Sequence, residues 1–392
     1  MYIERDILEK FEAVSSVYNI VAVVGPRQAG KTTFLKERLK GLNASYIMFD
    51  DPDARGLFDD DIKKFESQYI EGRAVAVLDE IQYGKEAGRK LKYLADKGWK
   101  IWITSSSQTV MGKEVLSWLV GRVTPVKLYP FSFSEFLRAK GQKETTPAMV
   151  RRGVWEHLAY GGYPKVVLTE SVEMKQTLLR DLYNTMVLKD IAQTFSIGDI
   201  RSLEEFCRYL SHSVGNVLIY DKAAGGMKLS FQTVKKYLDA MEKSYLIKLL
   251  QPFYTNKLKE VIKQPKVYFV DTGLRNAVAN SFPLALEREG KLFENYVLGE
   301  MLKLDLEVKY WQTKSGLEVD FVIEMDGKVI PVEVKISASA EKIEKNLRSF
   351  IEAYRPKLAF VVFYEGVSGE INIEGCRVVL TDVQGFTGMK KG

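Results

Sequence analysis

The sequence predicts an α/β protein of several domains, the first of which is built on a parallel sheet. Mainly apolar runs occur at 19–24, 73–82 and 100–107, and the second and third end in acidic and hydroxyl residues. Such runs are typical of strands buried on both faces. Segments with apolar residues three and four positions apart follow them, as in amphipathic helices. Hydrophobic residues make up 46% of the 392 residues, so the chain can bury more than one core.

The composition argues against several classes of site. Lys and Arg number 57 against 51 Asp and Glu, a net charge of +6, which permits nucleic-acid binding without favouring it. Two histidines, His157 and His212, do not suit a zinc site or a histidine-based triad. Cys207 and Cys376 form no metal or disulfide pattern, which fits a reducing compartment. Because no run approaches about 18 apolar residues, and the first residues do not resemble a signal peptide, we expect a cytoplasmic protein with no membrane partner.

The first strand leads into a loop that carries the phosphate-binding pattern G-x-x-x-x-G-K-[ST]. Its residues, which we expect to contact nucleotide, are Gly25, Pro26, Arg27, Gln28, Ala29, Gly30, Lys31, Thr32 and Thr33. The glycines let main-chain N–H groups surround phosphate oxygens at the N-terminus of the following helix. Lys31 is then expected to reach the β and γ phosphates, and the Thr32 hydroxyl to bind Mg²⁺. The sequence therefore predicts a site for ATP or ADP with Mg²⁺.

The next two strands end in side chains suited to hydrolysis. In an open parallel sheet, ligands bind at the carboxyl ends of the strands. Asp79 and Glu80 end one strand, so we expect Asp79 to assist Mg²⁺ and Glu80 to orient or deprotonate the attacking water. Ser106 ends the next strand and could bond the γ-phosphate or the water. The alternatives are an ordinary acidic strand end and a turn-forming serine.

The middle of the chain reads as helical. Residues 136–198 predict a helical lid over the sheet, whose motion would convert ATP binding into work. Residues 202–250 predict three helices followed by a strand pair, the winged-helix order. The third helix would carry Thr233, Lys235 and Lys236 to DNA, and lysines outnumber acids between 228 and 263. The alternative is that this unit packs only against its neighbours or a protein partner.

Four charged residues of the C-terminal region are predicted to converge. Strand alternation places Asp320 on one face of a strand within 316–325, and Glu333 and Lys335 on one face of the next strand. Glu294 lies on a preceding helix. Two carboxylates with a lysine beside them could hold Mg²⁺ or Mn²⁺ and activate a water. The alternatives are a solvent face of mixed charge and a nuclease-like fold with an inactive site.

Several motifs in this order resemble a family of prokaryotic, archaeal-type AAA-like P-loop ATPases. They are "VVGPRQAGKTT", "VLDEIQ", "ITSSS", "LVGRV" and "PFSFSEF". The resemblance implies a C-terminal domain similar to restriction endonucleases of the PD-(D/E)XK group. It also implies that Arg122 approaches the γ-phosphate, in the manner of an arginine supplied by a neighbouring subunit. The sequence departs from the family pattern at Ala29, Ser105 and Phe131.

Together these features predict a P-loop ATPase core at 1–135, a helical lid at 136–198, a winged helix at 199–258 and a restriction-endonuclease-like domain at 259–392. The predicted function is ATP hydrolysis that drives a switch or motor on DNA. Two alternatives stay open: a metal-dependent DNA nuclease gated by nucleotide, and a nucleotide-sensing scaffold that binds a protein. If Arg122 acts on a second subunit, the chain forms a homo-oligomer.

Overall fold

The computed structural model describes residues 2–106, 115–142, 145–254, 264–287, 289–325, 327–339 and 345–389. The chain divides into two compact units. The first comprises Met1–Phe131 and Lys243–Tyr245, and the second comprises Ser132–Glu242 and Leu246–Gly392. The division into four domains at 135, 198 and 258 stays a prediction.

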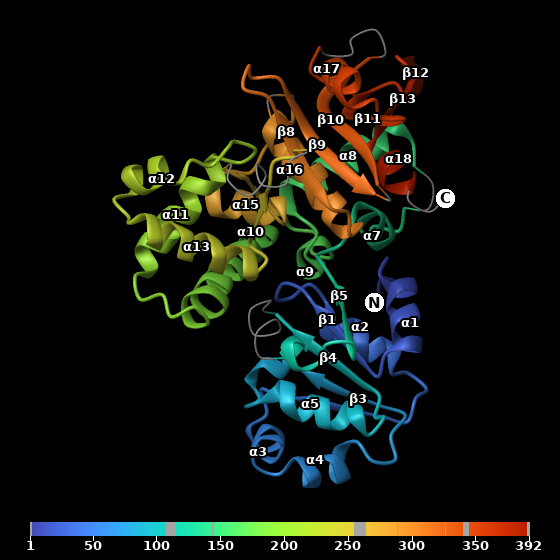
Figure 1. Cartoon of the computed structure of the whole chain (residues 1–392), viewed down its shortest axis with the longest axis vertical. Helices are drawn as coiled ribbons and strands as arrows, with labels where there is room; N and C mark the ends of the chain where they lie inside the picture. The colour runs from blue at the N-terminus through green and yellow to red at the C-terminus, as the bar shows by residue number, and fades with distance from the viewer. Residues whose placement is uncertain are drawn as a thin grey trace. The chain divides into compact units, whose positions relative to one another are not determined.

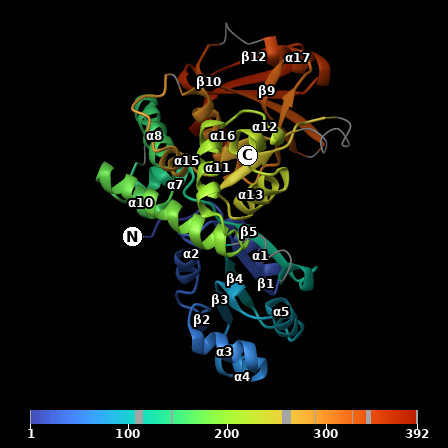
Figure 2. The same cartoon turned by 90° about the vertical axis from the view of Figure 1, so that its left-hand side faces the viewer.

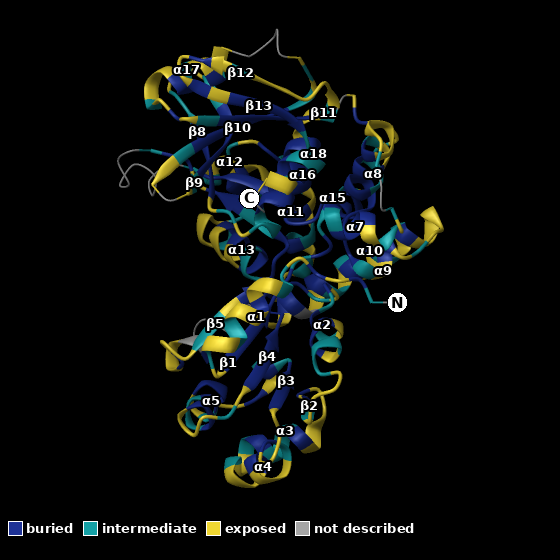
Figure 3. Ribbon diagram, turned by 90° about the vertical axis from the view of Figure 1, so that its right-hand side faces the viewer, coloured by how far each residue is buried: buried dark blue, intermediate teal, exposed yellow. Residues whose placement is uncertain are grey.

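The first unit is built on a five-stranded sheet, and its α/β character confirms the predicted fold class. The strands are β1 (Ile20–Val24), β2 (Ala44–Met48), β3 (Val75–Asp79), β4 (Ile101–Ser105) and β5 (Val123–Lys127). They lie in the order β2-β3-β4-β1-β5, and every neighbouring pair is parallel. Strands β1, β3 and β4 are buried along their whole length (Figure 3), as expected for a sheet covered on both faces.

Alternating side chains of β1 explain why both faces are covered. Val21 and Val23 pack into one core with Phe11 and Phe34. Ile20, Ala22 and Val24 pack into a second core on the other face. The helical elements of this unit are α1 (Leu8–Val17), α2 (Lys31–Arg38), α3 (Pro52–Asp60), α4 (Ile62–Tyr69), η1 (Ile81–Tyr83), α5 (Ala87–Asp96) and η3 (Leu116–Trp118) (Figure 1).

The second unit begins with helices. In chain order they are α7 (Phe133–Ala139), α8 (Pro147–Tyr160), α9 (Pro164–Val167), α10 (Val172–Thr185), the π-helical η4 (Met186–Gln193), α11 (Ile200–His212), α12 (Tyr220–Met227) and α13 (Phe231–Lys243). Helix α10, labelled in Figure 2, is followed directly by η4. Ser132 and Glu135 form a reciprocal capping box that starts α7.

A strand pair follows α13 in the second unit. Strand β6 (Ile247–Leu250) pairs antiparallel with β7 (Lys266–Phe269). The sequence predicted an edge of a hairpin at β6. Its partner lies beyond residue 258, where we predicted a domain boundary. Helices α15 (Thr272–Ala279) and α16 (Gly290–Lys303) come next.

A six-stranded sheet completes the second unit. Its strands are β8 (Val308–Gln312), β9 (Glu318–Met325), β10 (Lys328–Ala338), β11 (Leu358–Gly366), β12 (Gly369–Ile373) and β13 (Cys376–Asp382), with helices α17 (Lys345–Tyr354) and α18 (Val383–Gly388). The order is β12-β13-β11-β10-β9-β8. Strands β10, β11 and β13 run parallel, whereas β8, β9 and β12 pair antiparallel with their neighbours. The two strands predicted within 316–337 are therefore β9 and β10.

In the described part of the chain, no helix is long and apolar enough to cross a membrane.

Candidate functional site

The phosphate-loop pattern lies between β1 and α2, as predicted. A Cβ at Gly25 would stand 2.0 Å from the Leu128 carbonyl oxygen, so only glycine allows the main chain of the loop to pass there. Gly30 precedes α2 with a left-handed φ of 99°, and Gln28 also has a positive φ of 56°. These turns curl the loop back toward the helix N-terminus, the arrangement that suits an anion.

Lys31 is buried against this loop. Its Nζ donates to the carbonyl oxygens of Gly25 at 2.9 Å and Pro26 at 3.0 Å, and 5% of the residue is exposed. The ammonium group is therefore held over the loop, next to the main chain that would surround phosphate. Arg27 Nη2 donates to the Tyr83 hydroxyl at 3.0 Å.

Asp79 is the centre of a set of hydroxyl donors. Thr32 Oγ1 donates to Asp79 Oδ2 at 2.9 Å, and the Tyr46 hydroxyl donates to the same oxygen. Thr104 Oγ1 donates to the other oxygen, Oδ1. Burial, and then the bond to Asp79, raises the pKa of Tyr46, so its hydroxyl stays protonated and remains a donor. Among the described residues no lysine or arginine pairs with Asp79, so the carboxylate is oriented by neutral donors.

The Thr32 hydroxyl and the Asp79 carboxylate offer a hard oxygen pair at one point. Mg²⁺ favours one or two protein oxygens together with waters and substrate phosphates, so these two residues fit the ion that the loop implies. When bound with nucleotide, Mg²⁺ would neutralise phosphate charge.

Glu80 lies beside this pair in a strained conformation. Its φ is 56°, in the left-handed region that a non-glycine residue adopts at a cost and that often marks functional sites. Its N–H donates to Thr104 Oγ1 at 2.8 Å. Its Oε2 accepts from Ser106 Oγ at 3.2 Å and from the Gln82 amide. Ser106 also accepts from Gln82 Nε2 at 3.3 Å. The structure thus brings Glu80 and Ser106 together.

Arg122 lies away from the loop within its own chain. It precedes β5, whose first residue pairs with Ile20 at the start of β1, whereas the loop follows Val24. At about 3.3 Å per residue, this separation is on the order of 16 Å. Arg122 Nε is bonded to Asp96 Oδ1 at 2.7 Å. Arg122 therefore lies near the amino-terminal ends of the strands, whereas the loop with Lys31 lies at their carboxyl ends.

The C-terminal carboxylates do converge. The β9–β10 register pairs Phe321 with Val332, and continuing it by one residue sets Asp320 beside Glu333. Asp320 is buried and accepts from the Val334 N–H at 2.9 Å. Burial, followed by the charges of Glu294 and Glu333, raises the pKa of Asp320.

Lys335 joins these carboxylates through an ion pair of 2.9 Å to Glu333. The four side chains of the predicted set therefore lie close together in one neighbourhood: Glu294, Asp320, Glu333 and Lys335.

Lysines that the sequence analysis did not select neutralise this neighbourhood. Lys266 from β7 pairs with Glu318 at 2.6 Å, and Lys291 from α16 pairs with Glu294 at 2.7 Å. Burial alone would raise the pKa of Glu318, but the charges of Lys266 and Lys291 outweigh it and lower that pKa. We call Glu294, Glu318, Asp320 and Glu333 the acidic cluster.

The acidic cluster does not have the arrangement of a metal cage. In the described ranges, no group of three or more His, Cys, Asp or Glu side chains is placed to hold a metal ion. Ammonium groups lie against its carboxylates instead. The second Mg²⁺ or Mn²⁺ predicted from sequence does not fit this arrangement of side chains.

The predicted DNA contacts lie on α13. Lys235 and Lys236 are exposed and Thr233 is half-buried. Thr233 N–H donates to Ser230 Oγ at 3.0 Å, so Ser230 caps the start of this helix. Lys236 Nζ donates to the Ser196 carbonyl at 3.1 Å. Lys235 Nζ lies 4.7 Å from the centre of the Phe231 ring.

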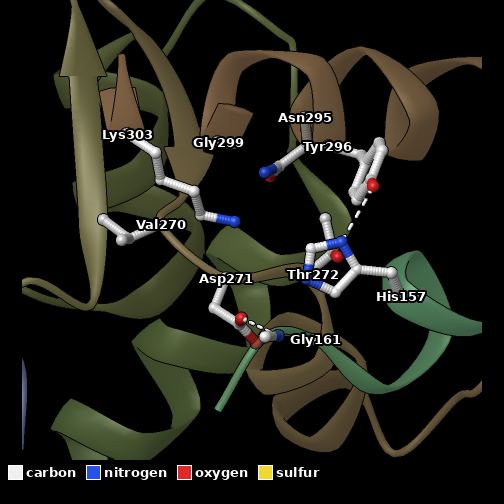
Figure 4. A pocket seen from close by; sticks show the side chains of 10 residues that line it. His157, Gly161, Val270, Asp271, Thr272, Asn295, Tyr296, Gly299 and Lys303 are labelled. Carbon is white, nitrogen blue, oxygen red and sulfur yellow. Dashed lines mark hydrogen bonds between the residues drawn. The ribbon is translucent and has the colours of Figure 1, made fainter. Parts of the chain in front are cut away.

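A separate small pocket lies among α8, α15 and α16 in the second unit. Figure 4 shows Lys303 extending into it and His157 bonded to Tyr296, with 2.8 Å between His157 Nδ1 and the Tyr296 hydroxyl. Asp271 accepts from the Gly162 and Leu274 N–H groups, and so caps α15. The sequence analysis selected none of these residues as site residues.

Three domain models match the chain. Residues 17–137 match the model of an AAA domain. Residues 151–285 and 289–377 match two domains of unknown function, DUF8612 and DUF4143. The AAA match covers the whole loop and Asp79, Glu80, Ser106 and Arg122. The models supply no description that bears on the predicted likeness to restriction endonucleases.

Curated relatives cover most of the chain at low identity. A protein of Haemophilus influenzae is 27% identical over 77% of this chain and 75% of its own length. A protein of Methanocaldococcus jannaschii is 25% identical over 86% and 79%. Both are described as uncharacterized. Among solved structures, a Walker-type ATPase of Pyrococcus abyssi aligns with a TM-score of 0.49 and 15% identity, over 71% of this chain and 96% of that one.

Proposed function

We propose that this chain hydrolyses ATP with Mg²⁺ and uses the nucleotide cycle as a switch or motor on DNA. The single observation that carries the ATPase proposal is the hydrogen bond from Thr32, which follows Lys31 in the loop, to Asp79 at the end of β3. The loop would bind the triphosphate, and Thr32 with Asp79 would hold Mg²⁺. Glu80, oriented by Ser106 and Gln82, would place the attacking water.

In this proposal, Arg122 can act only on ATP bound to a second copy of the chain. Its own loop is too far away, so the arginine would stabilise the γ-phosphate charge on a neighbouring subunit. In that case the chain acts as a homo-oligomer, and Arg122→Ala would lower turnover without lowering ATP affinity of the isolated chain.

The order of the helices and strands after α10, and the charge of exposed lysines on α13, support the DNA part of the proposal. Helices α11, α12 and α13 followed by the β6–β7 pair have the order of a winged helix. The exposed ammonium groups of Lys235 and Lys236 could contact phosphates, and their loss should weaken binding of all sequences alike.

The test is ATP turnover measured with and without duplex, single-stranded and branched DNA. We expect DNA to stimulate turnover and Lys31→Ala to abolish it. Lys40→Ala is the matched control, because Lys40 is an exposed lysine just beyond α2, paired with Glu37. Nucleotide binding without turnover, combined with no salt-sensitive DNA binding, would favour a protein-binding scaffold instead.

A second candidate function is nucleotide-gated DNA cleavage, favoured by the convergence of Asp320, Glu333 and Lys335 and opposed by the ammonium groups that lie against these carboxylates. Cleavage that needs Mg²⁺ or Mn²⁺ and disappears in Asp320→Ala and Glu333→Ala would support it. Cleavage that survives both substitutions would dismiss it.

A further inference from the structure

Three polar side chains at the ends of β3 and β4 form a closed triangle of hydrogen bonds. Gln82 lies on η1, and its Nε2 donates to Glu80 Oε2 and, at 3.3 Å, to Ser106 Oγ. Ser106 Oγ in turn donates to Glu80 Oε2 at 3.2 Å. Because a carboxylate accepts hydrogen bonds and cannot donate them, the N–H2 end of the Gln82 amide must face Glu80. The carbonyl end of that amide is therefore turned away from the Oε2 atom of Glu80.

This triangle uses every side-chain donor hydrogen that it contains. The amide of Gln82 carries two hydrogens and the hydroxyl of Ser106 carries one, and these three make the three bonds. Only acceptors are left over. Gln82 Oε1 is buried and accepts no hydrogen bond from the described residues. Both side-chain bonds that Glu80 accepts within the described ranges go to Oε2, so its Oε1 is open as well.

Open acceptors select the molecule that can bind beside the triangle. A buried carbonyl oxygen without a donor is costly, and such an atom in a native structure calls for a partner. A phosphate oxygen is itself an acceptor and would be repelled here. Water has two hydrogens to donate, and it keeps its lone pairs for attack on phosphorus. In this arrangement the triangle therefore suits water, and the Ser106 hydroxyl, already bonded to Glu80, is not a donor to the γ-phosphate.

The backbone that carries Gln82 is anchored on both sides. The Glu80 N–H donates to Thr104 Oγ1 at 2.8 Å, and Ile81, at the start of η1, is fully buried. Tyr83, at the end of η1, accepts from Arg27 of the nucleotide loop at 3.0 Å. The amide of Gln82 is thus held on a short turn that is tied both to β4 and to the loop expected to bind ATP.

We propose that Gln82 positions the attacking water, with Gln82 Oε1 accepting one of its hydrogens and Glu80 Oε1 the other. The inference rests on the proposed ATPase function and adds a residue to its water site. As the water oxygen bonds to the γ-phosphorus, the bond from phosphorus to ADP breaks and its electron pair leaves with ADP. One water proton passes to Glu80, and the other stays on the new phosphate, bonded to Gln82 Oε1.

The test compares ATP turnover of the full-length protein with that of Gln82→Met, which keeps an unbranched side chain but has no carbonyl to accept from water. Turnover at saturating ATP should fall at least about tenfold, while half-saturating ATP stays within about twofold, because the loop contacts are unchanged. Affinity for ADP with aluminium fluoride, which mimics the phosphoryl group under attack by water, should fall at least about tenfold. Affinity for ADP with beryllium fluoride, which mimics ATP before attack, should not change. Gln68→Met is the matched control, because Gln68 is an exposed glutamine on α4, and it should behave like the unmodified protein.

A second variant separates the carbonyl of Gln82 from its N–H2 group. Gln82→Lys can still donate to Glu80 but has no acceptor for water, so its turnover should be as low as that of Gln82→Met. Turnover near that of the unmodified protein in either variant would overturn the role of Gln82 and leave the ATPase proposal standing. Loss of turnover with undiminished affinity for ADP and aluminium fluoride, and with an unchanged melting curve, would also overturn it. No turnover by the unmodified protein would overturn the ATPase proposal and this inference with it.

Discussion

Asp79 in the first unit and Glu294 in the second unit are both buried carboxylates in a site predicted from sequence, but their partners differ. Asp79 accepts from the hydroxyls of Thr32, Tyr46 and Thr104. Glu294 accepts from the Tyr268 hydroxyl and pairs with Lys291 and Lys266. Hydroxyl donors orient a carboxylate and leave its negative charge in place, whereas ammonium groups cancel it. The first site can therefore receive a cation with nucleotide, and the second already contains cations.

The largest effect expected from this comparison is on stability. Lys266→Met leaves Glu318 and Glu294 without their buried counter-ion, and removing one partner of a buried pair costs about 3–5 kcal/mol. Urea unfolding of the second unit should show a loss of this size. Lys291→Met, at a half-exposed position, should cost about 1 kcal/mol or less. Similar costs for the two variants would mean that burial does not distinguish these lysines.

The next effect is on catalysis in the first unit. Glu80→Gln keeps the hydrogen-bonding shape but removes the charge that would orient water, so turnover should fall by about 100-fold, or roughly 2.7 kcal/mol. ATP affinity should be unchanged. Glu86→Gln is the control, because Glu86 is an exposed glutamate paired with Arg89 at 3.2 Å. Unchanged turnover in Glu80→Gln would mean that another residue orients the attacking water.

A third carboxylate, Glu66, lies outside both proposed sites. It shows what partner groups contribute to stability where no function is proposed. Burial opposes ionisation of Glu66, but hydrogen bonds from Lys97, Trp99 and Tyr93 outweigh it and lower the pKa. Glu66→Gln should therefore cost about 2 kcal/mol at pH 7.

The pH dependence of that cost has a definite sign. A lowered folded-state pKa gives stability above the usual value of 4.5, and that stability is lost as the pH falls through the folded-state pKa. The difference in melting temperature between Glu66→Gln and the unmodified protein should thus shrink below about pH 4.5. Exposed Glu71→Gln should show little difference at any pH. A difference that persists in acid would point to packing instead of charge.

The smallest effect is at Tyr46. Tyr46→Phe removes one neutral donor from Asp79, worth about 1 kcal/mol, so half-saturating Mg²⁺ for ATP turnover should rise about fivefold. Turnover at saturating Mg²⁺ should change little. Tyr69→Phe, on α4, should behave like the unmodified protein. A loss of turnover that excess Mg²⁺ does not restore would show that Tyr46 has a role beyond positioning Asp79.

The sequence predicted those features that depend on neighbours along the chain. The loop at 25–33 and the pair Asp79–Glu80 lie in short motifs at strand ends, and the side-chain alternation of two strands placed Asp320 and Glu333 on facing positions. These predictions needed only the period of a strand and the position of its end.

The features that were missed depend on pairing between distant segments. Tyr46 reaches Asp79 because β2 pairs with β3, and no local pattern marks that tyrosine. Lys266 reaches Glu318 because the tertiary fold packs side chains of β7 against side chains of β9. The only local signal was a lysine in an otherwise apolar strand, "KVYFV", which is uncommon for a buried strand unless the lysine is paired.

The most direct test of the contrast between the two sites is the number of Mn²⁺ ions bound per chain by the unmodified protein, with and without ATP. We predict one ion that requires ATP, that is lost in Asp79→Asn and that persists in Asp320→Ala. Tight Mn²⁺ binding without ATP that Asp320→Ala removes would contradict the account, as would the failure of ATP to recruit any ion.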